Sequence, residues 1–212
     1  MDADFWIERW ASNNIAFHNE EANAFLVRHV DSLGLSAGDR VFVPLCGKTR
    51  DIAWLLAQGY RVAGVELVRD AVEQLFADLG VAPARSAEGA MERFSAKGLD
   101  IFVGDIFDLS AGSAGPVDAV YDRAALVALP AEMRTRYTRR LLELAPSAPQ
   151  LLVTYVYDQS LKAGPPFSID KSEVASHYDA SHDLTLLDSE PMEGGLDGAC
   201  DAVREAWLIT PR

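Results

Sequence analysis

Short apolar runs rich in β-branched and aromatic residues recur along the chain and predict strands. Five of these runs are Arg40–Pro44, Arg61–Glu66, Leu99–Gly104, Val117–Asp122 and Gln150–Tyr157. Met91–Ala96 lies just before the third run and predicts the other arm of a hairpin. Leu184–Leu187 and Ala202–Ile209 predict two strands that close the sheet.

Segments between the strands carry apolar residues at helical spacing. From Thr49 to Gly59 the apolar residues lie on one helical face, and the glycine ends the pattern. The other predicted helices are Asn23–Val30, Asp70–Leu79, Ala131–Leu144 and Lys171–Tyr178. Val81–Ala90 and Ser110–Pro116 are small and polar, so both segments predict loops.

The alternation of strands and helices favours βαβ units and a mostly parallel sheet with helices on both faces. The prediction is a doubly wound α/β fold in a single domain over residues 1–212. The aromatic, mixed segment at residues 1–34 forms an N-terminal extension in this prediction.

Polar or conformationally special residues follow the apolar runs. These strand ends are Pro44–Lys48, Glu66, Asp105–Phe107, Asp122-Arg123 and Tyr155–Asp158. Open α/β sheets bind ligands at the carboxyl ends of their strands, near the point where the strand order reverses. The sequence therefore predicts the functional site at this edge of the sheet.

Gly47 and Glu66 are the most informative pair among these positions. Gly47 can adopt a backbone conformation closed to other residues, so that main-chain amides approach a ligand. Glu66 follows 19 residues later, at the end of the second strand. An acid about 20 residues after such a turn typically binds the ribose hydroxyls of an adenosine cofactor. The alternative is that Glu66 is a solvated strand-end residue or a helix cap.

The turn lacks the Gly-x-Gly-x-x-Gly pattern that binds the pyrophosphate of a dinucleotide. Gly47-Lys48-Thr49 imitates the end of a P-loop, but the position of the required earlier glycine is Phe42, inside a strand. An adenosine cofactor bound without phosphate recognition indicates S-adenosylmethionine.

Several motifs, in order, resemble the short bacterial form of the thiopurine S-methyltransferase family. They are Trp6-Ile-Glu-Arg-Trp10, Ile15-Ala-Phe-His18, Val43-Pro-Leu-Cys-Gly-Lys48, Gly64-Val-Glu66, Gly104-Asp-Ile-Phe-Asp-Leu109, Asp122-Arg-Ala-Ala-Leu-Val-Ala128 and Gly164-Pro-Pro-Phe167. The resemblance runs from Trp6 to about Phe167 and is looser from Ser168 onward. It implies the class I methyltransferase fold, Rossmann-like, with a seven-stranded sheet.

The resemblance also implies a site for S-adenosylmethionine. By motif, Trp10 lies over the cofactor with Trp6 close by, so that the N-terminal extension covers the site. Leu45 in the turn contacts the methionine part, Glu66 binds the ribose, and Ile106 flanks the adenine. Aromatic faces tolerate a sulfonium cation, which fits the two tryptophans.

Arg123 is expected to reach the carboxylate of the cofactor or nearby backbone, because the planar guanidinium matches a carboxylate. The alternative from the residues alone is an ion pair with Asp122 or Asp118. Phe17 is expected in the acceptor pocket by the same resemblance. His18 is a candidate base, or it caps local structure.

The amino-acid composition excludes some classes of binding partner. The chain has 212 residues with 19 Lys+Arg and 32 Asp+Glu, a formal net charge of −13. This balance argues against nucleic acid and against anionic membrane surfaces. The N-terminus carries acids where a signal peptide is basic and apolar, and Cys46 and Cys200 make no disulfide framework. We therefore expect a cytoplasmic protein, and a monomer.

The function implied is transfer of a methyl group from S-adenosylmethionine to a small aromatic or heterocyclic thiol. Bacterial members of the family are associated with selenite and tellurite detoxification, so selenium and tellurium species are further expected acceptors. No catalytic residue is predicted, because positioning lowers the barrier and such thiols ionise near neutral pH. No metal site is predicted. The alternatives are a nicotinamide-dependent oxidoreductase on the same fold and a non-catalytic protein that binds S-adenosylmethionine.

Overall fold

Strands and helices alternate along the chain in the computed structural model, which describes residues 3–12, 14 and 20–212. The strands of the described part are β1 (Arg40–Val43), β2 (Arg61–Glu66), β3 (Ala84–Glu88), β4 (Met91–Ala96), β5 (Leu99–Val103), β6 (Ala119–Arg123), β7 (Gln150–Tyr157), β8 (His182–Pro191) and β9 (Ala202–Pro211). The helices are α1 (Ala3–Ala11), α2 (Ala24–His29), α3 (Arg50–Ala57), α4 (Arg69–Asp78), α5 (Ala111–Ala114), α6 (Ala131–Leu144) and α7 (Lys171–Tyr178), with 3-10 turns at Val30–Leu33 and Leu126–Ala128.

The strands of the described residues form one nine-stranded sheet in the order β3-β4-β5-β2-β1-β6-β7-β9-β8. The five central strands from β5 to β7 pair in parallel. β4 and β9 run the opposite way, and β3 and β8 return to the direction of the central strands. Seven of the nine strands therefore point the same way, and the mostly parallel class I fold is confirmed.

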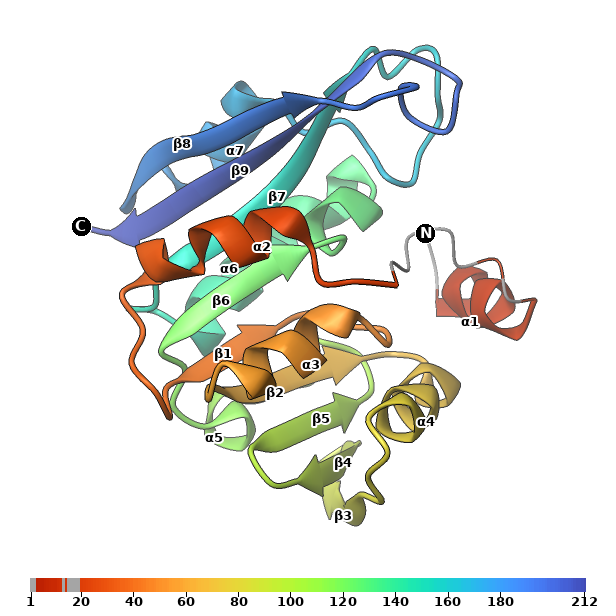
Figure 1. Cartoon of the computed structure of the whole chain (residues 1–212), viewed down its shortest axis with the longest axis vertical. Coiled ribbons are helices and arrows are strands. Elements are labelled where there is room, and N and C mark those ends of the chain that lie inside the picture. Colours follow the sequence, from red (N-terminus) through yellow and green to blue (C-terminus); the bar gives the residue numbers. More distant parts are fainter. Residues whose placement is uncertain (1–2, 13, 15–19) are drawn as a thin grey trace.

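Helices cover both faces of the sheet. Figure 1 shows α2 and α3 in front of the sheet and α6 and α7 behind it. One core joins Phe25 and Ile52 to the sheet on the front face, and a second joins Tyr137 and Tyr178 to the other face. The sheet is thus buried between two helical layers, as the long apolar runs of parallel strands require.

Local signals explain where the helices begin. The Thr49 side chain accepts a hydrogen bond from the Asp51 amide and caps α3, and Asn23 caps α2 through the Phe25 amide. Asp170 caps α7 in the same way. Each capping side chain satisfies an amide that the first turn leaves unpaired.

The expected number of seven strands is wrong, because the described chain forms nine. β3 lies inside Val81–Ala90, which was predicted to be a loop. Its side chains are almost all exposed and it pairs only with β4, so no hydrophobic face marks it in the sequence. The hairpin of β4 and β5 is confirmed.

The N-terminal segment contains a helix that the hydrophobic pattern did not predict. In α1, Trp6 and Trp10 stand four residues apart and therefore share one face. The later part of the predicted extension is integral to the fold, because α2 and the turn after it place Phe25, Leu26, Val30 and Leu33 in the front core.

Candidate active site

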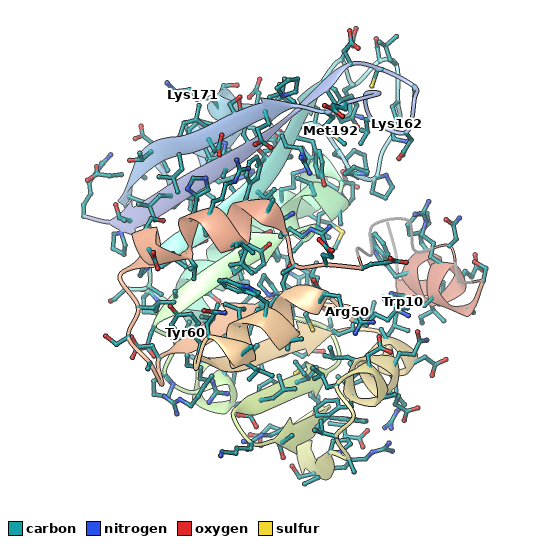
Figure 2. All side chains as sticks on the ribbon, in the orientation of Figure 1. Trp10, Arg50, Tyr60, Lys162, Lys171 and Met192 are labelled. Atoms are coloured by element: carbon teal, nitrogen blue, oxygen red, sulfur yellow. The ribbon has the colours of Figure 1, made fainter. Side chains whose placement is uncertain are left out.

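A cavity of about 460 Å³ opens at the carboxyl ends of the central strands. This volume lies within the range of about 300–1,000 Å³ typical of small-molecule sites. Trp10, Lys162 and Met192 line the cavity, and Figure 2 shows all three on the side toward which the parallel strands point.

The cavity sits where the strand order reverses. From β1 the chain proceeds to β2 on one side, whereas β6 lies on the other side of β1 and leads to β7. The loops after β1 and β6 therefore diverge and leave a crevice between them, as in other doubly wound sheets.

All seven residues predicted to bind the cofactor line this one cavity: Trp6, Trp10, Leu45, Gly47, Glu66, Ile106 and Arg123. They come from α1, from the turn after β1, and from the ends of β2, β5 and β6. The roles assigned to them remain predictions. Phe17 and His18 lie outside the described residues, so their predicted roles are untested.

The turn after β1 depends on unusual backbone angles. Leu45 has φ 45° and Gly47 has φ 51°, both in the left-handed region. The Cys46 amide donates to the carbonyl oxygen of Val65 at 3.0 Å and joins the turn to β2. A Cβ at Gly64 would lie 3.1 Å from the Cys46 sulfur, so the glycine in β2 allows this close approach.

Glu66 is bound to the turn rather than solvated. Its side chain is only 6% exposed. One carboxylate oxygen accepts from the Gly47 amide and the other from the Val68 amide, each at 2.8 Å. Burial raises the pKa of Glu66, and the backbone donors oppose that change. Each oxygen retains a lone pair that can accept from a hydroxyl group.

Trp10 joins α1 to the wall of the cavity. Its side chain is 7% exposed and packs with Val68 and Ala71 at the start of α4. A Cβ added at Gly47 would lie 3.0 Å from the Trp10 ring. The glycine therefore gives α1 its close approach to the turn.

Gly47→Ala is expected to loosen α1. Alanine at positive φ costs about 1–2 kcal/mol of stability, and the methyl group also displaces the Trp10 ring. Gly80→Ala is the matched control, because Gly80 has φ +69° with open space around an added Cβ. Gly47→Ala should lose at least as much thermal stability as Gly80→Ala, and only Gly47→Ala should speed hydrogen exchange at residues 3–11. Equal exchange in the two variants would contradict the contact.

Arg123 is available to a ligand. It forms no ion pair with Asp118 or Asp122, so this alternative finds no support among the described residues. Asp118 accepts from the Arg40 amide, and Asp122 accepts from the Leu126 amide and the Tyr137 hydroxyl. The Arg123 Nε is buried without a hydrogen-bond partner in the described chain. A buried guanidinium donor without a partner fits an anionic group in the cavity.

Asp122 holds the loop after β6. It is 1% exposed, and burial raises the pKa of its carboxyl group from 3.8 to about 6. The folded protein therefore binds this proton more tightly than the unfolded chain. The resulting stability is full below about pH 4 and is lost as the pH rises through about 6.

Asp122→Asn is expected to remove this pH dependence. A shift of about two pKa units corresponds to about 3 kcal/mol. The free energy of unfolding of the wild type, relative to that of the variant, should fall by up to this amount between pH 4 and pH 7. Urea denaturation across that range measures it. Parallel pH profiles for the two proteins would show that Asp122 does not titrate in this way.

Cys46 is a structural residue in this site. Burial, with a further contribution from the Glu66 carboxylate, raises the pKa of its thiol well above the usual value. A neutral buried thiol is a poor nucleophile, so the geometry gives Cys46 no covalent role.

The cavity wall also contains polar residues that the sequence patterns do not indicate. Asn23, Asp51, Tyr121 and Arg204 line the cavity. The alternation of side chains along β6 places Tyr121 on the same face as Arg123, which was a usable signal. Arg204 reaches the site because β9 pairs with β7, and the sequence does not indicate that pairing.

Another part of the wall is apolar. It includes Ile106, Phe107, Val127, Leu129, Met133, Pro165, Pro166, Met192 and Leu196. Such a wall suits a flat aromatic or heterocyclic ring, since burial of apolar surface is favourable and methionine adapts to the shape of its partner.

A family model and individual relatives of this chain carry the same description. A family model described as Thiopurine S-methyltransferase matches residues 1–196. A thiopurine S-methyltransferase of Xanthobacter autotrophicus is 57% identical over 210 residues, covering 99% of each chain. Another, from Gluconobacter oxydans, is 45% identical over 99% of this chain and 96% of the relative.

Solved structures share the fold at low identity. A methyltransferase from Anabaena variabilis, described as dependent on S-adenosylmethionine, has a TM-score of 0.66 at 14% identity, with 99% of this chain and 95% of the other covered. A Burkholderia thailandensis N1-methyltransferase, solved with S-adenosylhomocysteine, has a TM-score of 0.63 at 18% identity, with coverage of 98% and 87%.

Proposed function

Because this chain belongs to the thiopurine S-methyltransferase family, we propose that it methylates small aromatic or heterocyclic thiols of the thiopurine kind. It is an S-methyltransferase that uses S-adenosylmethionine, so the predicted family, activity and cofactor are confirmed. The alternative of a nicotinamide-dependent oxidoreductase is not supported.

The order of the strands in the sheet supports the proposed placement of the cofactor. The adjacent strands β5, β2, β1 and β6 end beside Ile106, Glu66, Leu45 and Arg123, respectively. Adenine, ribose, methionine chain and carboxylate follow one another in the same order along S-adenosylmethionine. One extended cofactor laid across the four strand ends thus meets an apolar flank, an acid, a leucine and a guanidinium in turn.

The N-terminal residues complete this arrangement. Within the single domain, the part of residues 1–34 that precedes α2 is the proposed extension over the cofactor, since α2 and the turn after it belong to the core. Trp6 and Trp10 in α1, together with Asn14 and Asn23, line the cavity from that side. Aromatic rings beside the sulfonium tolerate its charge and exclude water from the reacting groups. Phe17 remains the proposed acceptor contact.

Bound S-adenosylmethionine supplies an electrophilic methyl group on a positively charged sulfur. The sulfur of the acceptor forms the new bond to the methyl carbon as the old carbon–sulfur bond breaks, and S-adenosylhomocysteine leaves. The protein holds the acceptor in line behind the methyl group. This positioning lowers the activation free energy by on the order of 7–11 kcal/mol. An acidic thiol arrives ionised, so His18 is not required as a base.

The apolar wall of the cavity supports a flat acceptor. Met133, Pro165 and Leu196 present carbon-rich surface there. Reduced anions of selenium and tellurium share the soft nucleophilic character of a thiolate, and we include them as proposed acceptors. No helix in the described part of the chain is long and apolar enough to cross a membrane. We further propose a monomer that acts in the cytoplasm.

Transfer of labelled methyl groups tests the proposal. The protein is incubated with methyl-labelled S-adenosylmethionine and a panel of aryl thiols, alkyl thiols and reduced selenium and tellurium anions, and the products are identified by mass. We expect the aryl and heterocyclic thiols to be methylated with the highest kcat/KM. Binding of the cofactor without transfer to any acceptor would instead support a non-catalytic binding protein.

A further inference from the structure

A buried carboxylate at the start of α3 has no cationic partner among the residues that the structure describes. Asp51 is 1% exposed, yet it forms part of the cavity wall. It takes part in no ion pair with any described residue, and its hydrogen bonds come from neutral donors. The backbone amide of Asn23 donates to one oxygen at 2.7 Å and the Tyr121 hydroxyl donates to the other at 3.1 Å.

These two contacts leave the charge of Asp51 uncompensated. Each carboxylate oxygen has two lone pairs and uses one of them. A buried charge without an opposite partner is costly, so proteins pair such charges or place them where a ligand completes the pair. The contacts also orient the carboxylate, since Asn23 and Tyr121 hold it from different elements.

Arg123 carries the opposite charge on the same wall. Tyr121 and Arg123 lie two residues apart on β6 and share a face of the strand. Burial, with a contribution from Asp51, raises the pKa of the Tyr121 hydroxyl, while Arg123 lowers it. Asp51 accepts from the Tyr121 hydroxyl, and Arg123, two residues further along the same face, has a buried Nε without a partner in the described chain.

A carboxylate and a guanidinium that line one cavity are complementary to an α-amino acid zwitterion. We propose that Asp51 binds the α-ammonium of the methionine part of the cofactor, opposite a carboxylate held by Arg123. This inference rests on the proposed placement of S-adenosylmethionine. The Asn23 amide then links the start of α2 to the methionine part through the same carboxylate.

The affinities for three ligands distinguish recognition of the ammonium by Asp51 from a purely structural role. S-adenosylhomocysteine carries the ammonium, its deamino analogue lacks only that group, and 5′-methylthioadenosine lacks the whole amino acid. Asp51→Asn preserves the shape and one acceptor. A hydrogen bond to a charged group corresponds to about 10- to 150-fold in affinity. We expect Asp51→Asn to lose this factor for S-adenosylhomocysteine and less than about twofold for the other two ligands.

Asp70→Asn is the matched control. Asp70 stands in the first turn of α4 as Asp51 does in α3, but it is exposed and does not line the cavity. The control removes the same charge from the same position of a helix, and it should leave all three affinities unchanged. Calorimetric titration at neutral pH measures each dissociation constant.

The outcomes are distinct. An equal loss for all three ligands in Asp51→Asn would assign Asp51 a structural role and overturn the inference. If that variant does not fold, the wild type still decides, because equal affinity for S-adenosylhomocysteine and its deamino analogue would exclude recognition of the ammonium. Wild-type protein that binds none of the ligands would overturn the cofactor site itself.

Discussion

Glu66→Ala is expected to weaken binding of S-adenosylhomocysteine by about 10- to 150-fold, because two ribose hydroxyls lose a charged acceptor. The variant also leaves the amides of Gly47 and Val68 without the carboxylate that both of them contact at 2.8 Å. Part of the loss in affinity is therefore caused by disturbance of the turn after β1. Calorimetric titration of the folded variant gives the total.

A ligand without ribose hydroxyls separates the two contributions. A 2′,3′-dideoxy analogue of S-adenosylhomocysteine cannot donate to Glu66, so its affinity reports only the disturbed turn. The affinity for S-adenosylhomocysteine divided by the affinity for the dideoxy analogue measures the contribution of the ribose hydroxyls. We expect this ratio to fall steeply in Glu66→Ala and less in Glu66→Gln, which keeps an acceptor oxygen. An unchanged ratio would remove Glu66 from ribose recognition and leave it with its contacts to the turn.

Arg123→Met is expected to lower the affinity for S-adenosylhomocysteine by a similar factor of about 10 to 150, since a charge-assisted pair with the ligand carboxylate is lost. Methionine retains much of the apolar stem, so the cavity wall keeps its volume. Arg123→Lys should recover only part of the affinity, because an ammonium lacks the planar pair of donors.

5′-Methylthioadenosine is the control for Arg123, because it has no carboxylate. Its affinity should be the same in wild type and in both variants. If Arg123→Met weakens 5′-methylthioadenosine as strongly as S-adenosylhomocysteine, the guanidinium supports the cavity instead of contacting the ligand. Thermal melts of the variants show whether the fold survives.

The predictable part of this site is local in sequence. The turn at Gly47 and the acid at Glu66 follow strands whose apolar runs are unmistakable, and the crossover rule for parallel strands places their ends at one edge. Because the sequence motifs lie at those ends, Leu45, Gly47, Glu66, Ile106 and Arg123 meet in the same cavity. Trp6 and Trp10 reach it from α1, and only the resemblance to the family placed them there.

Features that depend on pairing or on exposed strands were not predictable in this way. β3 is polar and exposed, so its hydrogen bonds to β4 leave no hydrophobic signature. Arg204 lines the cavity only because it pairs in register with Tyr155 on β7. Asp51 reads in the sequence as an ordinary acid in the first turn of a helix, and only the fold places it at the cavity.

The most direct test is a crystal structure of the protein with S-adenosylhomocysteine, in which the position of each part of the ligand along the sheet edge is measured. We expect adenine beside Ile106, ribose hydroxyls within hydrogen-bond distance of Glu66, and the carboxylate beside Arg123. A ligand that runs in the opposite direction, or ribose hydroxyls that do not contact Glu66, would contradict this placement.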